Sequence, residues 1–401
     1  MQGFKPGILA WTAIAFFAWG VAESNAGETT GLDDSTIKIG LLAPITGAEA
    51  NYGESYKTVT ELLTKQANDS GGINSRKIEL VVADEGCSGT TARAATNKLI
   101  VRDGVFAIVG GTCAAAIVPV VPLMVEHQVP FLTAMVIADK LTNPVNPNVF
   151  RAQVRATAIG QLMVTYAIDA FKPTRIAVVN QDDAYGAGEL NGTLIELKKR
   201  NITLVAHETH KVGEPDLSAQ ALRLKEANPE VVLVHSYATQ TAALVRKAFE
   251  LGMRVQFVAG VASAATQIIQ LIGEEASRGS FSAISVVVDP TGKSDPLTKD
   301  FVAHYVREYP VISSRPGIPG PGEFQVLGGY SVFMEGLKRA GRELTRSNFI
   351  SALETVRNFK TGGYPSITFT KQNHDGVSSS HFWRYSKDGA IQLTDKLYTV
   401  E

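Results

Sequence analysis

The chain is sparing in cysteine, in long apolar runs and in net charge. It has two cysteines among 401 residues, and neither lies near the N-terminus, so we expect no lipid attached there. Beyond the first 26 residues no segment approaches the ~20 consecutive apolar residues of a membrane span. The formal net charge is −1 at pH 7 with basic residues scattered along the chain, which indicates neither nucleic acid nor an anionic membrane surface as a partner.

Catalytic motifs are scarce as well. The sequence contains no G-x-S-x-G, G-x-x-x-x-G-K-[ST] or H-E-x-x-H motif. His207 and His210 have a metal-like spacing, but on a strand that spacing places them on opposite faces, and no third ligand is nearby. Asp182 and Asp183 could serve as general acid and base, yet adjacent carboxylates in a strand-to-helix loop are usually turn and cap residues. We expect no metal, and we predict that the protein is not an enzyme.

One glycine-rich stretch, RIAVVNQDDAYGAGELNG, resembles a dinucleotide fingerprint. Gly186, Gly188 and Gly192 follow an apolar strand, and Glu208 lies about twenty residues beyond Gly188, where a ribose-binding acid belongs. The glycine spacing is one residue too long, however, and the two neighbouring aspartates would repel a pyrophosphate. The first strand, where this fingerprint is expected, is followed by APITGAEANYG without it. We therefore expect no dinucleotide and no other cofactor.

The N-terminal segment has the pattern of a secretory signal. It carries an early positive charge at Lys5, an apolar run over 8–21, and small residues up to Ala26. We predict a signal peptide over 1–26, cleaved near Ala26, and a free, soluble periplasmic protein. The remaining chain of roughly 375 residues is long for one core and suits two domains.

The two cysteines favour a disulfide, because lone thiols in an exported chain most often pair. Cys87 follows the strand pattern KIELVVADE and Cys113 follows VFAIVGG, so in a parallel sheet both lie past strand ends on the same edge. A bridge between them closes a loop worth about 3 kcal/mol in the chain-entropy model. A redox-active pair would need closer spacing or a basic neighbour.

Apolar runs alternate with segments of helical period from Ile37 onward. IKIGLLAP, KIELVVADE, VFAIVGG and VPFLTAM read as strands, and YKTVTELLTKQAND and TTARAATNKLIVRD read as helices between them. A second series begins near Arg155 with the helix ATAIGQLMVTYAIDAF and continues through the strands RIAVVNQ, ITLVAHE, VVLVHSY and VQFVAG. Such alternation is typical of parallel, doubly wound sheets. The predicted fold class is α/β, with two such units.

After Gly279 the alternation weakens. FSAISVVVDP resembles a crossing strand, and helical patterns follow at 297–308, at 324–340 and in SNFISALETVRN, with the Gly- and Pro-rich loop SRPGIPGPGEF between the first two. The tail alternates every two residues, with turn residues at NHDG and KDGA, which indicates antiparallel ribbon.

Loops at the carboxyl ends of the strands are where open α/β sheets bind ligands. In the first unit these loops are APITGAEANYGES, GGTCAAAIVP and LTAMVIAD, and in the second they are NQDDAYGAG, HSYATQ and AGVASAAT. Tyr52, Tyr185 and Tyr237 stand in three of them. A single tyrosine there is usually part of ordinary packing, but three at equivalent positions favour a shared ligand site.

These residues resemble a known family. PITGAEANYG at Pro44–Gly53, AIVGGTC at Ala107–Cys113, VPFLT, DDAYGAG and FELGMRVQF are similar, in order, to the periplasmic binding proteins of the leucine and branched-chain amino acid class. The similarity extends from about Ile37 to Tyr398. It implies a non-enzymatic monomeric receptor that acts with the permease and ATPase subunits of an ABC importer.

The resemblance implies two lobes joined by three crossings, with the ligand between the lobes. The crossings should fall near Gln153–Ala156, Ser280–Ser285 and Gly363–Ser366. The lobes would then be residues 36–154 plus 284–364 (lobe 1) and residues 155–283 plus 365–401 (lobe 2).

The same resemblance marks departures at the ligand site. The amino acid binders place hydroxyl groups where this chain has Ala114 and Ile137, and a carboxylate for the ligand ammonium where it has Val261. The residues expected to contact ligand are Tyr52, Cys113, Ala114, Met135, Val136, Ile137, Tyr185, Tyr237 and Val261.

These departures bear on the ligand. A buried ammonium must be paired, because an unpaired buried charge costs several kcal/mol, and none of the three replaced positions offers a partner. Backbone N–H groups over 113–116, at a helix start, remain for a carboxylate. We predict a small hydrophobic amino acid or a related aromatic or aliphatic carboxylate, the latter favoured unless Asp182, Asp183 or Glu323 reaches the ligand.

Two other functions stay open. An extracytoplasmic sensory protein would use the same fold without a transporter, and permease and ATPase genes beside this one would favour import instead. An exported enzyme would use Asp182 and Asp183, but it lacks a nucleophile or a metal site.

Overall fold

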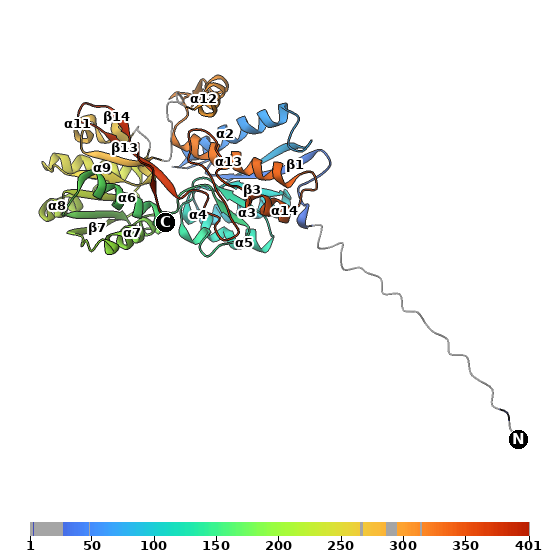
Figure 1. The fold of residues 1–401 in the computed structure, drawn as a ribbon, viewed down its shortest axis with the longest axis horizontal. Coiled ribbons are helices and arrows are strands. Elements are labelled where there is room, and N and C mark those ends of the chain that lie inside the picture. The colour runs from blue at the N-terminus through green and yellow to red at the C-terminus, as the bar shows by residue number, and fades with distance from the viewer. Residues whose placement is uncertain are drawn as a thin grey trace.

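Two separate sheets organise the chain (Figure 1). The computed structural model describes residue 3 and residues 27–47, 49–264, 268–285, 295–312 and 315–400. The predicted signal peptide over 1–26 therefore lies outside the described residues, apart from Gly3. None of the helices in these ranges combines the length and the apolar character that crossing a bilayer requires.

The first sheet has five strands in the order β2-β1-β3-β4-β5, and all its pairings are parallel. Most of its strands are joined by helical segments, because parallel neighbours need a crossover connection. The strands are β1 (Thr36–Ala43), β2 (Lys77–Asp84), β3 (Ala107–Gly110), β4 (Phe131–Thr133) and β5 (Val149–Arg151). The helical segments are α2 (Ala50–Asp69), α3 (Gly89–Asn97), the π-helical η1 (Lys98–Arg102), α4 (Ala114–Ile117), η2 (Val118–Val120), α5 (Val121–Glu126) and η3 (Asp139–Leu141).

The second sheet has eight strands. Strands β7, β6, β8, β9 and β10 are parallel neighbours in that order, and β13 pairs antiparallel with β10, β14 and β15. The strands are β6 (Ile176–Gln181), β7 (Ala206–His210), β8 (Val231–His235), β9 (Gln256–Ala259), β10 (Phe281–Ser285), β13 (Ser379–Tyr385), β14 (Ile391–Leu393) and β15 (Tyr398–Thr399). The helical segments are α6 (Ala156–Phe171), α7 (Ala184–Lys199), α8 (Ser218–Ala227), α9 (Ala238–Glu250), η4 (Val261–Ser263), α10 (Ile268–Ile272) and α11 (Glu274–Ser277). The predicted α/β class and the antiparallel tail are confirmed.

Three helices near the C-terminus return to the first sheet: α12 (Pro296–Glu308), α13 (Pro321–Ala340) and α14 (Arg346–Leu353). Figure 1 shows α13 beside α2, and the Tyr330 hydroxyl of α13 lies 2.7 Å from Thr64 Oγ1 of α2. Buried Arg346 donates 3.0 Å hydrogen bonds to the carbonyl oxygens of Val105 and Phe106, beside β3. A short pair, β11 (Val311–Ile312) and β12 (Arg315–Pro316), lies between α12 and α13.

The described residues locate two of the three expected passages between the sheets, the first and the third. The first passage lies between β5 and α6, as predicted. Ser280–Ser285 is almost wholly strand β10, and the residues that follow it, 286–294, lie outside the described ones. The third expected crossing, Gly363–Ser366, is too early. His374 O accepts from Arg151 N, Gly376 N donates to Arg151 O, and the Arg151 guanidinium pairs with Asp375 at 2.6 Å, so the chain stays with β5 to about residue 376.

Some elements differ from the sequence prediction. Helix α2 begins at Ala50 rather than Tyr56, so Tyr52 lies in its first turn instead of a loop. Strand β7 begins at Ala206 rather than Ile202, and β5 was not predicted because it is only three residues long. Short edge strands carry too little pattern to be read from one sequence.

Two glycines of the fingerprint-like stretch, Gly188 and Gly192, lie where α7 packs on α6. A Cβ atom on Gly192 would lie 1.8 Å from the carbonyl oxygen of Thr157, so glycine is what lets α7 approach α6 this closely. A Cβ on Gly160 of α6 would in turn lie 1.9 Å from the carbonyl oxygen of Glu189. Helix contact therefore explains Gly192, whereas a Cβ on Gly186 would lie 2.2 Å from the carbonyl oxygen of Gln181, at the turn from β6 into α7.

Candidate functional site

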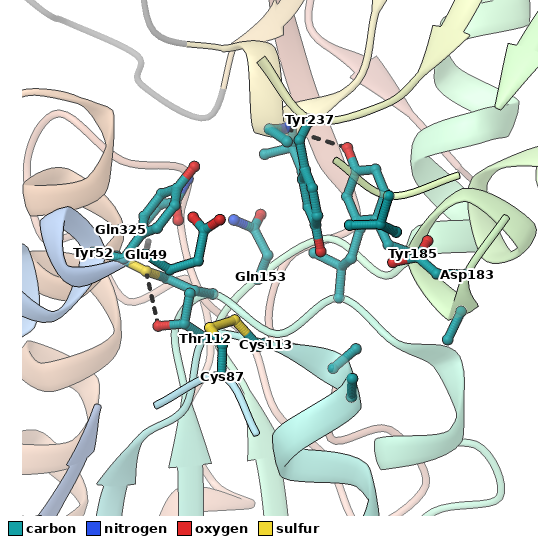
Figure 2. Close-up of a pocket in the computed structure, with 18 residues that line it drawn as sticks. Glu49, Tyr52, Cys87, Thr112, Cys113, Gln153, Asp183, Tyr185, Tyr237 and Gln325 are labelled. Atoms are coloured by element: carbon teal, nitrogen blue, oxygen red, sulfur yellow. Dashed lines mark hydrogen bonds between the residues drawn. A yellow bond between two sulfur atoms is a disulfide. The ribbon is translucent and has the colours of Figure 1, made fainter. Parts of the chain in front are cut away.

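The carboxyl ends of strands from both sheets meet at one cavity of about 340 Å³ (Figure 2). Parallel strands place their following loops on one edge, and here the loops after β1, β2, β3 and β4 face those after β6, β8 and β9. The lining residues are Glu49, Tyr52, Cys87, Thr112, Cys113, Ala114, Ala115, Met135, Ile137, Gln153, Asp183, Ala184, Tyr185, Val212, Tyr237, Val261, Ala262 and Gln325.

The structure brings most of the predicted ligand residues to this cavity. Those that line it are Tyr52, Cys113, Ala114, Met135, Ile137, Tyr185, Tyr237 and Val261. Val136 does not line it, because its side chain is 1% exposed and packs in the apolar cluster beneath the loop. Its two neighbours point into the cavity, so the residue between them points the other way.

A disulfide joins Cys87 and Cys113 on the first-sheet side of the cavity, as the sequence predicts. Their Cα atoms lie 5.2 Å apart, three residues past the ends of β2 and β3. Glu85 lies beneath them, fully buried, and its Oε1 accepts from the backbone N–H groups of Thr112 at 3.0 Å and Cys113 at 3.3 Å. The Cys113 amide, expected to hold a ligand carboxylate, is therefore already occupied.

Burial dominates the electrostatics of Glu85. It raises the pKa of this carboxyl to about 7, against the two amide hydrogen bonds that lower it and with a further rise from Asp84. The second oxygen, Oε2, is buried without a hydrogen-bond partner among the described residues. Although Glu85, Cys87 and Cys113 lie within 4.8 Å of one another, both sulfur atoms are in the disulfide, so the group is not a metal site as it stands.

Glu49 is a lining residue that the sequence reasoning missed. It is the N-cap of α2, but its side chain makes no capping hydrogen bond. Figure 2 shows its carboxylate directed into the cavity instead. Burial raises its pKa. The available signal was an acid one helical turn before Tyr52, which becomes visible only if the helix is known to start at Ala50.

Gln153 was predicted as part of a crossing and not as a ligand residue. Its side chain is 1% exposed, and its Oε1 accepts from Val154 N at 2.8 Å. Its Nε2 is buried without a hydrogen-bond partner among the described residues. In Figure 2 this amide nitrogen is directed toward Glu49.

Asp183 lines the opposite side, where its polar atoms are used within the protein. Oδ1 accepts from Gly186 N at 2.9 Å and so caps α7, and Oδ2 accepts from Gln181 Nε2 at 2.9 Å. Gln181 Oε1 in turn accepts from Tyr237 N at 3.1 Å. Asp182 is exposed and does not line the cavity. The pair is thus a cap and a turn residue, as expected.

Three tyrosine rings flank the cavity. Those of Tyr185 and Tyr237 lie 5.1 Å apart between centroids, and the Tyr185 hydroxyl accepts from Ala262 N at 3.3 Å. Burial, with a smaller contribution from Glu49, raises the pKa of Tyr52 to about 12. Burial also raises the pKa of Tyr237, helped by the charges of Asp183 and Glu49, so Tyr237 and Glu49 influence each other across the cavity.

We call the side of the cavity formed by Asp183, Tyr185 and Tyr237 the second wall, and the opposite side, on the first sheet, the first wall. A buried glutamate–histidine pair lies behind the second wall. Glu189 and His235 are both 0% exposed, with His235 Nδ1 2.9 Å from Glu189 Oε2 and His235 Nε2 3.0 Å from Thr193 Oγ1. A Cβ on Gly260 would lie 2.4 Å from Glu189 Oε2, so the loop after β9 rests directly on the carboxylate. Burial first and Glu189 second raise the pKa of Tyr185 well above its ordinary value. One carboxylate therefore contacts the end of β8 at His235 and the loop after β9 at Gly260, and it also acts on Tyr185 at the start of α7.

The remaining candidates lie elsewhere. His207 is exposed and His210 buried, with their Nε2 atoms 2.7 Å from Asn180 Oδ1 and Ser236 Oγ, and no cluster of metal ligands includes them in the described ranges. Glu323 is buried in α13, where it accepts from Gly320 N and Ser55 Oγ, and it does not line the cavity. Among the described lining residues there is no lysine, arginine or histidine.

The sequence of this chain is similar to those of periplasmic binding proteins. A family model for periplasmic binding proteins matches residues 36–390. The Leu/Ile/Val-binding protein BraC3 of Rhizobium johnstonii is 30% identical over 248 residues, which are 62% of this chain and 67% of that protein. The chain spans less than two-thirds of some other curated relatives, among them 59% of an amino acid binding protein of Pseudomonas aeruginosa.

Two solved structures share the fold. LivJ of Streptococcus pneumoniae, a branched-chain amino acid transporter substrate binding protein in complex with isoleucine, has a TM-score of 0.78 at 20% identity, covering 91% of this chain and 99% of its own. A solute binding protein of an ABC transporter from Rhodopseudomonas palustris, in complex with 3,4-dihydroxy benzoic acid, has a TM-score of 0.77 at 21% identity, covering 91% and 98%.

Proposed function

The chain belongs to the periplasmic binding protein family, within its branched-chain amino acid class, and from this premise we propose that it carries a small solute to an ABC importer. The family is one of solute-binding proteins rather than enzymes. The ligand would bind between the two sheets, which act as two lobes closing on it. The lobes would follow the expected ranges, except that the first one extends to about residue 376.

One observation carries the proposal. The same cavity receives loops from the carboxyl ends of strands in both sheets. A volume of about 340 Å³ is at the small end of the range for ligand pockets, which suits a compact solute. Tyr52, Tyr185 and Tyr237 offer large, rigid surfaces to an apolar body.

We take the ligand to be a small hydrophobic amino acid or a related aromatic or aliphatic carboxylate. Both kinds of ligand occur in structures with this fold, one holding isoleucine and the other 3,4-dihydroxy benzoic acid. The ligand residues would be those predicted residues that line the cavity, with Glu49 and Gln153 added. The partners would be a permease and an ATPase, and the receptor would work as a periplasmic monomer.

Ligand binding and lobe closure can be tested together. A thermal-shift screen against amino acids, organic acids, amides and sugars identifies a stabilising solute, because a ligand that binds only the folded state raises its melting temperature. Solution scattering with that solute should then give a smaller radius of gyration than the free protein. A solute that binds tightly without changing the scattering profile would contradict a closing receptor, and failure of every solute would contradict the function.

A further inference from the structure

Two polar groups in the cavity wall are directed into the cavity rather than to a partner within the protein. The Glu49 side chain makes no capping hydrogen bond to α2, and the Gln153 Nε2 has no hydrogen-bond partner among the described residues. Gln153 is almost wholly buried, so bulk water does not compensate its N–H groups. Figure 2 shows both groups directed into the same part of the cavity, next to Tyr52.

The cavity is acidic and holds no counter-charge of its own. Two carboxylates, Glu49 and Asp183, line it, and no basic side chain does so in the described part of the chain. Asp183 is already engaged by Gly186 N and the Gln181 amide, so Glu49 is the carboxylate that remains. A ligand anion placed beside the Glu49 carboxylate without a counter-charge would weaken binding, whereas an N–H donor would form a favourable hydrogen bond with that carboxylate.

Together these groups define the chemistry of a complementary ligand. We propose that the ligand has an N–H-bearing head group next to an oxygen acceptor, as in an α-amino acid or a primary amide, with the N–H donating to Glu49 and the oxygen accepting from Gln153. Its apolar body lies between the tyrosine rings. This inference rests on the proposed receptor function, and it reverses the preference for a plain carboxylate that the missing polar groups at Ala114, Ile137 and Val261 suggest.

The loss of an acid at Val261 therefore does not leave an ammonium without a partner. In this chain Glu49 of the first lobe would pair with the ligand ammonium, in place of the second-lobe carboxylate that the resemblance to amino acid binders implies. The main competing arrangement is a direct hydrogen bond between Gln153 Nε2 and Glu49 when the lobes close. That arrangement would satisfy both groups without ligand and would leave no preference for an N–H donor.

Calorimetry with two matched series separates these arrangements. Leucine, 4-methylpentanamide and 4-methylpentanoic acid share one body, and phenylalanine, 3-phenylpropanamide and 3-phenylpropanoic acid share another. The wild-type protein should bind the amino acid or the amide at least about tenfold more tightly than the acid of the same body, as expected for a hydrogen bond to a charged acceptor. Comparing the amino acid with the amide of the same body shows whether the N–H group that binds Glu49 is an ammonium or a primary amide.

Variants assign the preference to its residues. Glu49→Gln should bring the affinity ratio to near one, and Gln153→Met, which keeps the side-chain volume but loses the donor, should weaken the amino acid and amide by about tenfold or more. Asp182→Asn is the matched control, an exposed carboxylate outside the cavity, and should leave every affinity unchanged.

The outcomes are separable. An acid that binds as tightly as its amide, or a Glu49→Gln protein that keeps the wild-type preference, overturns the inference while upholding the receptor function. A different solute from the thermal-shift screen can bind when none of the six compounds does. If that solute has no N–H donor, it also overturns the inference. If it has an N–H group and an adjacent oxygen, it supports the inference. A screen in which nothing binds rejects the receptor function itself.

Discussion

The two walls of the cavity differ in whether the protein itself supplies hydrogen-bond partners for their polar side chains. On the second-sheet side, Asp183 caps α7 and accepts from Gln181, and the Tyr185 hydroxyl accepts from Ala262 N. Behind them Glu189 pairs with His235 through Oε2, while its Oε1 is buried without a hydrogen-bond partner among the described residues. On the first-sheet side, the Glu85 Oε2 and the Gln153 Nε2 at the passage between the sheets have no hydrogen-bond partner among the described residues, and Glu49 makes no capping hydrogen bond. The contrast therefore holds for the groups that line the cavity: those of the second wall are held by hydrogen bonds within the protein, while Glu49 and the Gln153 Nε2 on the other side are directed into the cavity.

This difference suggests a division of labour in a closing receptor. A wall whose lining groups are hydrogen-bonded within the protein can hold aromatic rings in fixed positions before the ligand arrives, which lowers the entropy cost of binding. A wall with unsatisfied groups gains hydrogen bonds only when a ligand supplies partners, which makes binding specific. The following experiments test each half of the comparison.

The largest effect is expected behind the second wall. Glu189→Ala leaves His235 buried without its carboxylate and opens a gap under Gly260, so the free energy of unfolding should fall by about 3 to 5 kcal/mol. Urea denaturation measures the loss. Glu208→Ala is the control, because Glu208 pairs with Arg223 at the surface and its loss should matter far less. Equal losses in the two variants would show that the second wall has no special support.

A smaller and pH-dependent effect is expected at the first wall. Because burial raises the pKa of Glu85 to about 7 from an ordinary 4.5, the folded state holds a proton that the unfolded state releases in this window. The stability contributed by that proton is present below pH 4.5 and is lost as the pH rises through about 7. The wild type should lose on the order of 2 kcal/mol relative to Glu85→Gln between about pH 5 and pH 8. Parallel stability profiles would mean that Glu85 is solvated.

Much of this architecture could be predicted from the sequence, because strand and helix periodicity is a local signal. The two parallel units, the return of the C-terminal helices to the first one and the Cys87–Cys113 bridge all follow from residues that stand near one another in the chain or from the resemblance. Most predicted ligand residues also line the cavity, since loops after parallel strands must share an edge.

The polar chemistry of the site could not be predicted in the same way. Glu49 enters the cavity because α2 begins six residues earlier than its apolar pattern indicates, and Gln153 does so because a linking segment passes beside the site. Val136 was predicted to contact the ligand but is buried, because packing decides which side chains of a short irregular loop face the cavity. Whether a polar group is satisfied depends on partners distant in sequence, such as Thr112 and Cys113 for Glu85.

The smallest effect separates stability from binding. Asp183→Ala removes the cap of α7 and should lower the free energy of unfolding by about 1 kcal/mol, and so should Thr345→Ala, which removes the cap of α14 at Asn348 N. Only Asp183→Ala should also weaken the tightest ligand, because Tyr185 lies in the first turn of α7. If both variants weaken binding equally, the second wall is no more a fixed platform than the rest of the fold.

The contrast between the walls is tested most directly by a crystal structure of the protein with its tightest ligand. We predict an N–H group of the ligand within hydrogen-bonding distance of Glu49, a ligand oxygen accepting from Gln153 Nε2, and unchanged bonds from Asp183 to Gly186 and Gln181. A structure in which Glu49 and Gln153 bond to each other while the ligand's polar head rests on the second wall would contradict this division of roles.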